Sequence, residues 1–97
     1  MAERRFQLRG YVEFGAADVL RSELLTLVNE TNDDLVLDGA RLEFIDSYGI
    51  AVIAQIRRLL AVHDRRLRIV NLSSPRRRPF ELLGLGDFLD DDTPEPA

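Results

Sequence analysis

The chain has 97 residues, 45% of them hydrophobic and 31% charged, which is the composition of one small soluble globular domain. It contains no cysteine, and this excludes disulfides, thiol catalysis and thiolate metal sites. The formal net charge is −4, but five of the 17 acidic residues lie in residues 87–97, so the remainder is nearly neutral and lacks the basic face that nucleic acid requires.

The ends of the chain carry no sign of a membrane or secretory segment. No apolar run approaches the roughly 20 residues of a membrane span, and the first ten residues lack the apolar core of a signal peptide. We therefore expect a cytoplasmic protein without membrane insertion. Residues 1–89 are expected to form the domain, and residues 90–97 have the composition of an acidic disordered tail.

The first predicted element is an extended segment over residues 4–14, in which apolar side chains alternate loosely and Gly10 marks a bend. From Ala16 the period becomes that of a helix, because apolar residues recur at intervals of three and four positions. These residues are Leu20, Leu24, Leu27 and Val28. The polar residues from Asn29 to Asp33 end this helix.

The next two elements are a buried strand and a second helix. The continuous apolar run at residues 35–38 is typical of a strand covered on both faces, and residues 41–45 extend it. A helix then ends near His63. Its apolar face comprises Val52, Ile53, Ile56, Leu59 and Leu60.

Residues 67–72 predict a third strand. Ser74 and Pro75 then give a cap followed by proline at the first helical position, and the short third helix stops at Gly84 and Gly86. This alternating order predicts an α/β fold with a small mixed or mostly parallel sheet and helices packed on it.

The second predicted strand is connected to the second predicted helix by four residues, Asp46, Ser47, Tyr48 and Gly49. The carboxyl end of a strand and the amino end of a helix meet there, which is where open α/β sheets place functional groups. A helix start leaves about four N–H groups unpaired, and either Asp46 or Ser47 can accept from one of them as the N-cap. Gly49 permits a close approach of backbone or partner. The sequence therefore predicts a functional site at this junction.

The sequence contains no clear pattern for catalysis, metal binding or cofactor binding. His63 is the single histidine and has no recognisable nucleophile or metal partner, and the chain contains no glycine-rich phosphate loop or metal-ligand spacing. We expect no enzyme activity, no catalytic residue, no metal and no cofactor. Arg65, Arg66 and residues 76–78 are expected on a solvated face, with contact to an acidic partner as the alternative.

The sequence around the junction resembles the STAS family, the anti-sigma factor antagonists of bacteria. An apolar strand, an Asp-Ser motif with a glycine, an apolar helix, a further strand and a short basic helix follow one another from Leu35 to Leu89. Upstream, residues 10–13 are similar to the Gly-Glu-Leu-Asp signature of the family, with Glu13 at the acidic position. The resemblance covers about residues 8–89 and implies a single STAS-like domain.

The resemblance implies a partner and a switch. Family members bind an anti-sigma factor, often a serine kinase, and phosphorylation of a hydroxyl in the Asp-Ser motif ends that binding until a phosphatase restores it. Ser47 is then the candidate phosphoacceptor. The implied partner-binding residues are Glu13, Asp46, Ser47, Tyr48 and Gly49.

Tyr48 departs from the common pattern, because it occupies the second hydroxyl position, where the family often carries its acceptor. In branches with Asp-Ser-aromatic the acceptor is the hydroxyl beside the aspartate, which here is Ser47. An antagonist that is not switched at all remains an alternative. Two other roles stay open: an accessory subunit of a lipid-transport ABC ATPase complex and a stress-signalling scaffold. The sequence leaves both a monomer and a weak homodimer open.

Overall fold

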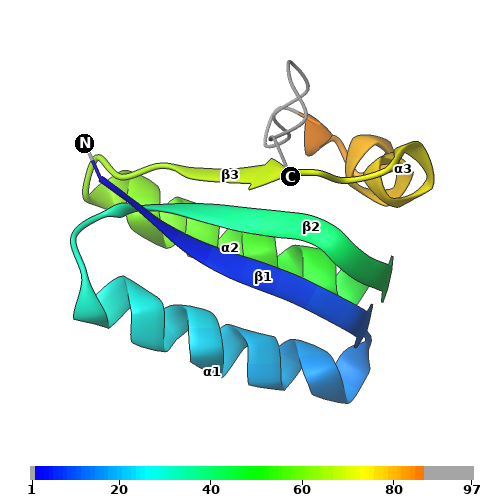
Figure 1. Cartoon of the computed structure of the whole chain (residues 1–97), viewed down its shortest axis with the longest axis horizontal. Coiled ribbons are helices and arrows are strands. Elements are labelled where there is room, and N and C mark those ends of the chain that lie inside the picture. Colours follow the sequence, from blue (N-terminus) through cyan, green and yellow to red (C-terminus); the bar gives the residue numbers. More distant parts are fainter. Residues whose placement is uncertain (1, 87–97) are drawn as a thin grey trace.

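A computed structural model describes residues 2–86 and shows three strands alternating with three helices (Figure 1). The elements are β1 (Glu3–Val12), α1 (Phe14–Glu30), β2 (Asp34–Ile45), α2 (Ser47–Val62), β3 (Leu67–Val70) and α3 (Ser74–Leu82). The predicted order and the α/β class are confirmed. The predicted end of the domain at residue 89 and the predicted tail at residues 90–97 lie outside the described residues.

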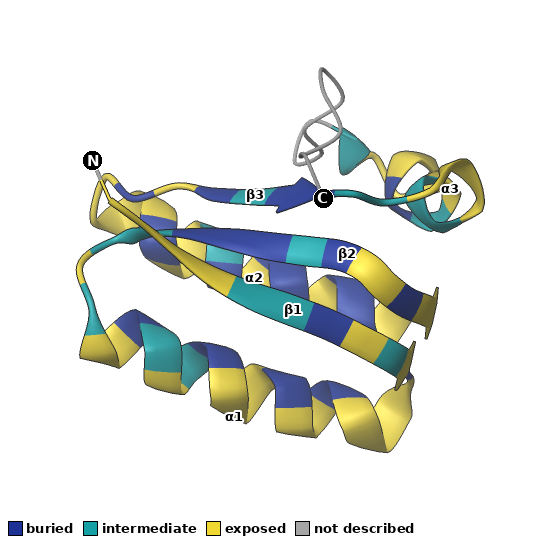
Figure 2. Ribbon diagram, viewed as in Figure 1, coloured by how far each residue is buried: buried dark blue, intermediate teal, exposed yellow. Residues whose placement is uncertain are grey.

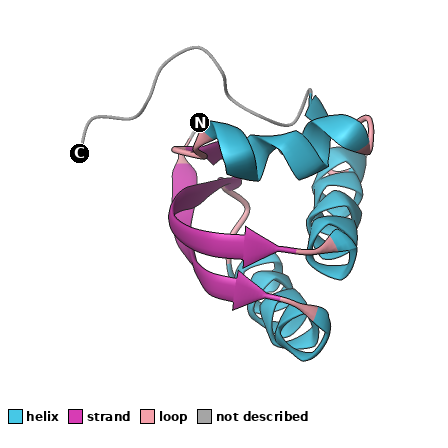
Figure 3. Ribbon diagram, turned by 90° about the vertical axis from the view of Figure 1, so that its right-hand side faces the viewer, coloured by secondary structure: helices cyan, strands magenta, loops and turns pink. Residues whose placement is uncertain are grey.

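The three strands form one sheet in the order β1-β2-β3, and both pairings are parallel. Viewed along the strands, α1 and α2 lie on the same face of the sheet, and α3 crosses at its end (Figure 3). β2 contributes extra residues opposite β1 at two register shifts, one between Gln7 and Arg9 and one between Gly10 and Tyr11. Gly10 has a φ of 62°, so the bend predicted there is confirmed.

The core lies between the sheet and the inward sides of α1 and α2, where buried residues gather (Figure 2). Six aliphatic side chains of this layer are completely buried: Leu24, Leu35, Leu37, Ile53, Ile56 and Leu60. Val36 on β2 is buried as well, although α1 and α2 both pack on one face of the sheet. Leu59 was predicted on the apolar face of α2, but 37% of it is exposed, because it lies at the edge of that face.

Element ends differ from the prediction by a few residues. α1 begins at Phe14 instead of Ala16, because Glu13 is already the N-cap residue. β3 stops at Val70, and Asn71 follows with a φ of 62°, a conformation that ends a strand. Ser73 is the N-cap residue of α3, so Pro75 lies one residue further into the first turn than predicted.

A cluster of hydrogen-bonded polar side chains lies on the face of the sheet opposite α1 and α2. Asp38 accepts hydrogen bonds from the Ala40 N–H (3.0 Å), from Asn71 (3.1 Å) and from Arg5 (3.3 Å). Burial raises the pKa of Asp38, but the hydrogen bonds to its charged form outweigh burial, and the net pKa lies below the ordinary 3.8.

We expect Asp38 to make the domain sensitive to acid. A carboxyl whose pKa is lowered by folding contributes stability above its unfolded pKa and loses it as the pH falls through the folded value. The free energy of unfolding should therefore decrease below about pH 4, near the ordinary value, and less steeply in Asp38→Asn. Urea titrations of both proteins between neutral and acid pH measure this difference; equal slopes would contradict the role given to Asp38.

Candidate functional site

The predicted junction lies at the carboxyl edge of the sheet, between the ends of β1 and β2 and the starts of α1 and α2. The Asp46 N–H donates to the Val12 carbonyl at 3.1 Å, which fixes the end of β2 beside the end of β1. Glu13 follows Val12 directly, so Glu13 and Asp46 leave two neighbouring strands at one edge. The structure therefore brings the two sequence-predicted segments, residues 10–13 and 46–49, together.

Asp46 is the residue that caps α2. Its Oδ1 accepts from the Gly49 N–H at 3.0 Å, while its carbonyl accepts from the Ile50 N–H at 3.0 Å. Ser47 is the first residue of α2 and is exposed. The capping that the sequence left open between two side chains thus falls to Asp46. The hydroxyl of Ser47 stands in solvent at the positive end of a helix dipole.

Gly49 is buried, and the chain itself makes the close approach that a glycine permits there. A Cβ at this position would lie 2.6 Å from Ile45 Cγ1 and 2.8 Å from Val12 Cγ1. Both neighbours are β-branched and buried, so they have little freedom to move aside. Gly49 therefore allows the first turn of α2 to sit against the ends of β1 and β2.

We expect Gly49→Ala to lower the free energy of unfolding by about 1–3 kcal/mol, the usual cost of overpacking a core. Gly15→Ala is the matched control, because Gly15 is also helical but a Cβ added there would have nothing within 4 Å. Alanine stabilises a helix by about 0.8–1 kcal/mol relative to glycine, so Gly15→Ala should leave the free energy of unfolding unchanged or raise it. Chemical denaturation compares the two, and equal effects would contradict the packing role of Gly49.

Exposed aromatic rings surround the junction, and the sequence pattern predicted a surface role for only one of them. Tyr48 is 56% exposed and meets Phe14 edge-on, with ring centroids 4.9 Å apart. Tyr11 and Phe44 lie beside each other at the ends of β1 and β2, with centroids 6.3 Å apart. We call these four residues the aromatic rim. Aromatic side chains are enriched at protein interfaces, and exposed apolar patches mark interaction sites.

Glu13 is exposed and contributes to α1 through its backbone. Its carbonyl accepts from the Ala17 N–H at 2.7 Å, and its side chain makes no capping hydrogen bond. The carboxylate therefore remains available at the surface next to the aromatic rim. Glu13 and Asp46 thus bring two carboxyl groups to the junction, whereas Ser47, which follows Asp46, carries no charge.

A shallow groove of about 330 Å³ runs from the aromatic rim between α1 and α2. It is lined by Phe14, Ala17, Asp18, Tyr48, Ala51, Val52, Gln55 and Arg58. A hydrogen bond of 3.1 Å from Arg21 to Gln55 links the two helices nearby. Within residues 2–86 no group of three potential metal ligands occurs. No helix in the described part of the chain is long and apolar enough to cross a membrane.

The model of the STAS domain family matches residues 4–95, and the chain therefore belongs to the STAS domain family. This confirms the resemblance carried by the junction.

Among solved structures, the chain is similar to the anti-sigma factor antagonist SpoIIAA in its unphosphorylated form. The TM-score is 0.81 with 25% sequence identity, over 94% of this chain and 80% of that one. The phosphorylated form of the Bacillus cell fate determinant SpoIIAA gives a TM-score of 0.72 with 25% identity, over 94% of this chain and 83% of that one. A structure of Mglu matches 74% of this chain and 18% of that one, with a TM-score of 0.64 and 26% identity. No curated protein sequence matches the chain.

Proposed function

We propose that this protein is an anti-sigma factor antagonist-like binding module, and not an enzyme, whose partner is an anti-sigma factor of the serine kinase type. The observation that carries the proposal is the exposed Ser47 at the start of α2, directly after Asp46, which caps the helix by accepting from the Gly49 N–H. The similarity to SpoIIAA over most of both chains supports it. A cytoplasmic location follows from such a partner.

The partner surface in this proposal is the junction with its aromatic rim. Tyr48 and Phe14 supply exposed apolar area, and Glu13 and Asp46 supply charge. Gly49 lets the first turn of α2 pack against the ends of β1 and β2. Tyrosine contributes large contact area at low entropic cost, which makes Tyr48 the expected anchor of the interface.

Phosphorylation of Ser47 is the proposed switch. A phosphate adds about −1.5 to −2 charges, and the start of a helix tolerates an anion with a gain of roughly 0.3–1 kcal/mol. The fold would therefore survive the modification. The binding surface would change, because the phosphate adds negative charge beside Asp46. A docking partner would have to remove water from this charge, and that costs free energy. A phosphatase would reverse the change.

Recovery of the protein from its native host tests the proposed partner. The protein carrying an affinity tag is purified with its bound proteins, and the mass of the peptide containing residues 46–49 is measured. An anti-sigma factor kinase among the bound proteins is the expected result. A transporter ATPase or a multi-protein stress complex would instead support the accessory-subunit or scaffold alternatives.

A further inference from the structure

β1 forms an edge of the sheet along its whole length. In the order β1-β2-β3 its strand partner is β2, and in the part of the chain that the structure describes no strand pairs with its outer side. The carbonyls of Ala2 and Val12 accept from the N–H groups of Asp34 and Asp46, each at 3.1 Å. Backbone groups of a strand alternate between its two edges, so those of Gln7 face outward. A strand edge of this length is a template for another strand.

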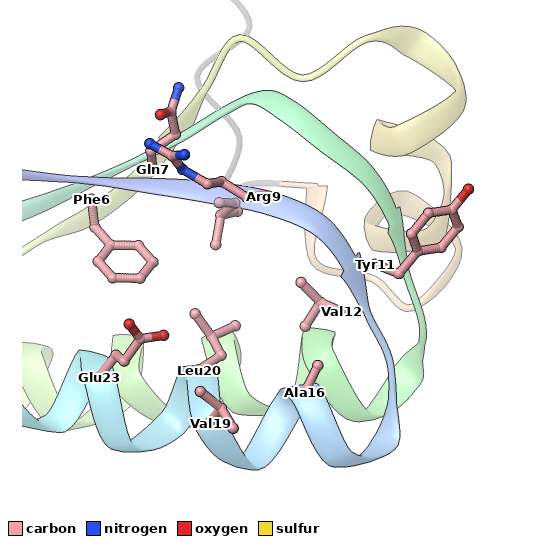
Figure 4. Close-up of a pocket in the computed structure, with 10 residues that line it drawn as sticks. Phe6, Gln7, Arg9, Tyr11, Val12, Ala16, Val19, Leu20 and Glu23 are labelled. Carbon is pink, nitrogen blue, oxygen red and sulfur yellow. The ribbon is translucent and has the colours of Figure 1, made fainter.

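The outer edge of β1 borders an apolar groove of about 460 Å³ between β1 and α1 (Figure 4). Phe6 points from β1 toward α1, where Leu20 and Glu23 lie, whereas Gln7 points away from the helix. Val19 on the wall of the groove is 61% exposed. A strand added to this edge would place alternate side chains into the groove.

We propose that the occupant is a second copy of the chain, whose β1 pairs antiparallel with this β1 around a two-fold axis through Phe6. Residues directly opposite in an antiparallel pair share a face, so Phe6 would meet Phe6 of the second copy over the groove. On the other face, Glu3 would lie opposite Arg9 of the second copy, and this pair would occur twice. A two-fold interface requires such self-complementarity.

Repulsion between arginines disfavours the registers that are shifted by two residues from this one. A shift of two residues in one direction places Arg5 opposite Arg9 of the second copy, and a shift in the other direction places Arg5 opposite itself. Like charges directly opposite each other destabilise a strand pair. In the register centred on Phe6, Arg5 lies opposite Gln7, and no like charges meet. Glu3 is accessible to Arg9 of the second copy, because its side chain is 42% exposed, although its carboxylate also binds Arg68 at 3.0 Å.

Sedimentation equilibrium of the full chain tests whether the pairing occurs. The average mass should rise from the monomer value of 11.1 kDa toward twice that value with concentration. Gln7→Pro removes an outward N–H and should weaken association at least about tenfold, with the circular dichroism spectrum unchanged. A monomer at about 1 mM, or a dimer that Gln7→Pro leaves intact, would overturn the proposal.

An exchange of charges tests the register and does not depend on the Gln7 variant. Arg9→Glu and Glu3→Arg should each associate about tenfold more weakly than the unmodified chain, because each variant places like charges opposite each other twice. An equimolar mixture should restore association, since each altered residue then meets an opposite charge. A mixture that associates no better than the single variants would exclude this register. The proposal is independent of the anti-sigma partner, whose proposed surface lies at the carboxyl edge of the sheet.

Discussion

Replacing Ile53 with alanine should lower the free energy of unfolding by about 2–5 kcal/mol, the range seen when a large buried aliphatic side chain is truncated. Ile53 lies on α2 and is completely buried in the layer between the helices and the sheet. The loss has two parts, the transfer free energy of the removed atoms and the cavity left in a close-packed core. Leu60→Ala, further along the same face of the helix, should cost a similar amount, because Leu60 is also 0% exposed.

Val62→Ala is the control for this prediction. Val62 is the last residue of α2 and is 78% exposed, so its truncation removes few contacts. We expect its effect to stay within about 0.5 kcal/mol, as for most surface substitutions. Urea-induced unfolding of the three variants gives the comparison. A stability of Ile53→Ala close to that of Val62→Ala would show that the buried face of α2 is misassigned.

Replacing Ser47 with aspartate should weaken binding of the anti-sigma partner by at least about tenfold, or roughly 1.4 kcal/mol, while the fold is preserved. The fold is spared because an acidic side chain suits the first turn of a helix. Binding suffers because a unit charge within about 5 Å of Asp46 is repelled by roughly 1–3 kcal/mol and must be desolvated against the partner.

Two substitutions complete this test. Ser22→Asp makes the same chemical change at an exposed position of α1, outside the junction, and should leave the affinity unchanged. Tyr48→Ala removes the exposed ring that packs against Phe14 and should also weaken binding, without any change of charge. Isothermal titration calorimetry with the purified partner measures all three. An unchanged affinity of Ser47→Asp would remove Ser47 from the interface.

Features encoded by local pattern were predictable from the sequence. The alternation of strands and helices follows from hydrophobic period, and the buried face of α2 follows from apolar residues spaced three and four apart. The junction was found because an acidic residue, a hydroxyl and a glycine between a strand and a helix have a defined capping chemistry. Capping involves residues three apart in sequence, as Asp46 and Gly49 are.

Features that depend on distant parts of the chain were not predictable in this way. Arg65 was expected on a solvated face, but it is buried, and its guanidinium donates to the carbonyls of Asp33 at 2.8 Å and Val28 at 3.2 Å. These acceptors lie more than 30 positions away. No short-range pattern marks an arginine that will satisfy the end of another helix.

The aromatic rim escaped prediction for the same reason, and so did the identity of the residues that approach Gly49. Phe14 was assigned to an extended segment with other apolar residues, and only the meeting of α1 and α2 shows that its ring pairs with Tyr48 outside the core. Gly49 was interpreted as room for backbone or a partner. The room is filled by Ile45 and by Val12, which lies on another strand.

The central claim is that an uncharged Ser47 permits binding and a phosphorylated Ser47 prevents it. The most direct measurement is the affinity of the partner kinase for the protein before and after incubation with ATP, with the site verified by intact mass and by Ser47→Ala. We expect one added phosphate, absent in Ser47→Ala, and a loss of affinity of at least about tenfold. Unchanged binding by a protein that carries the phosphate on Ser47 would contradict the claim, and so would the absence of any phosphate with a kinase that binds tightly.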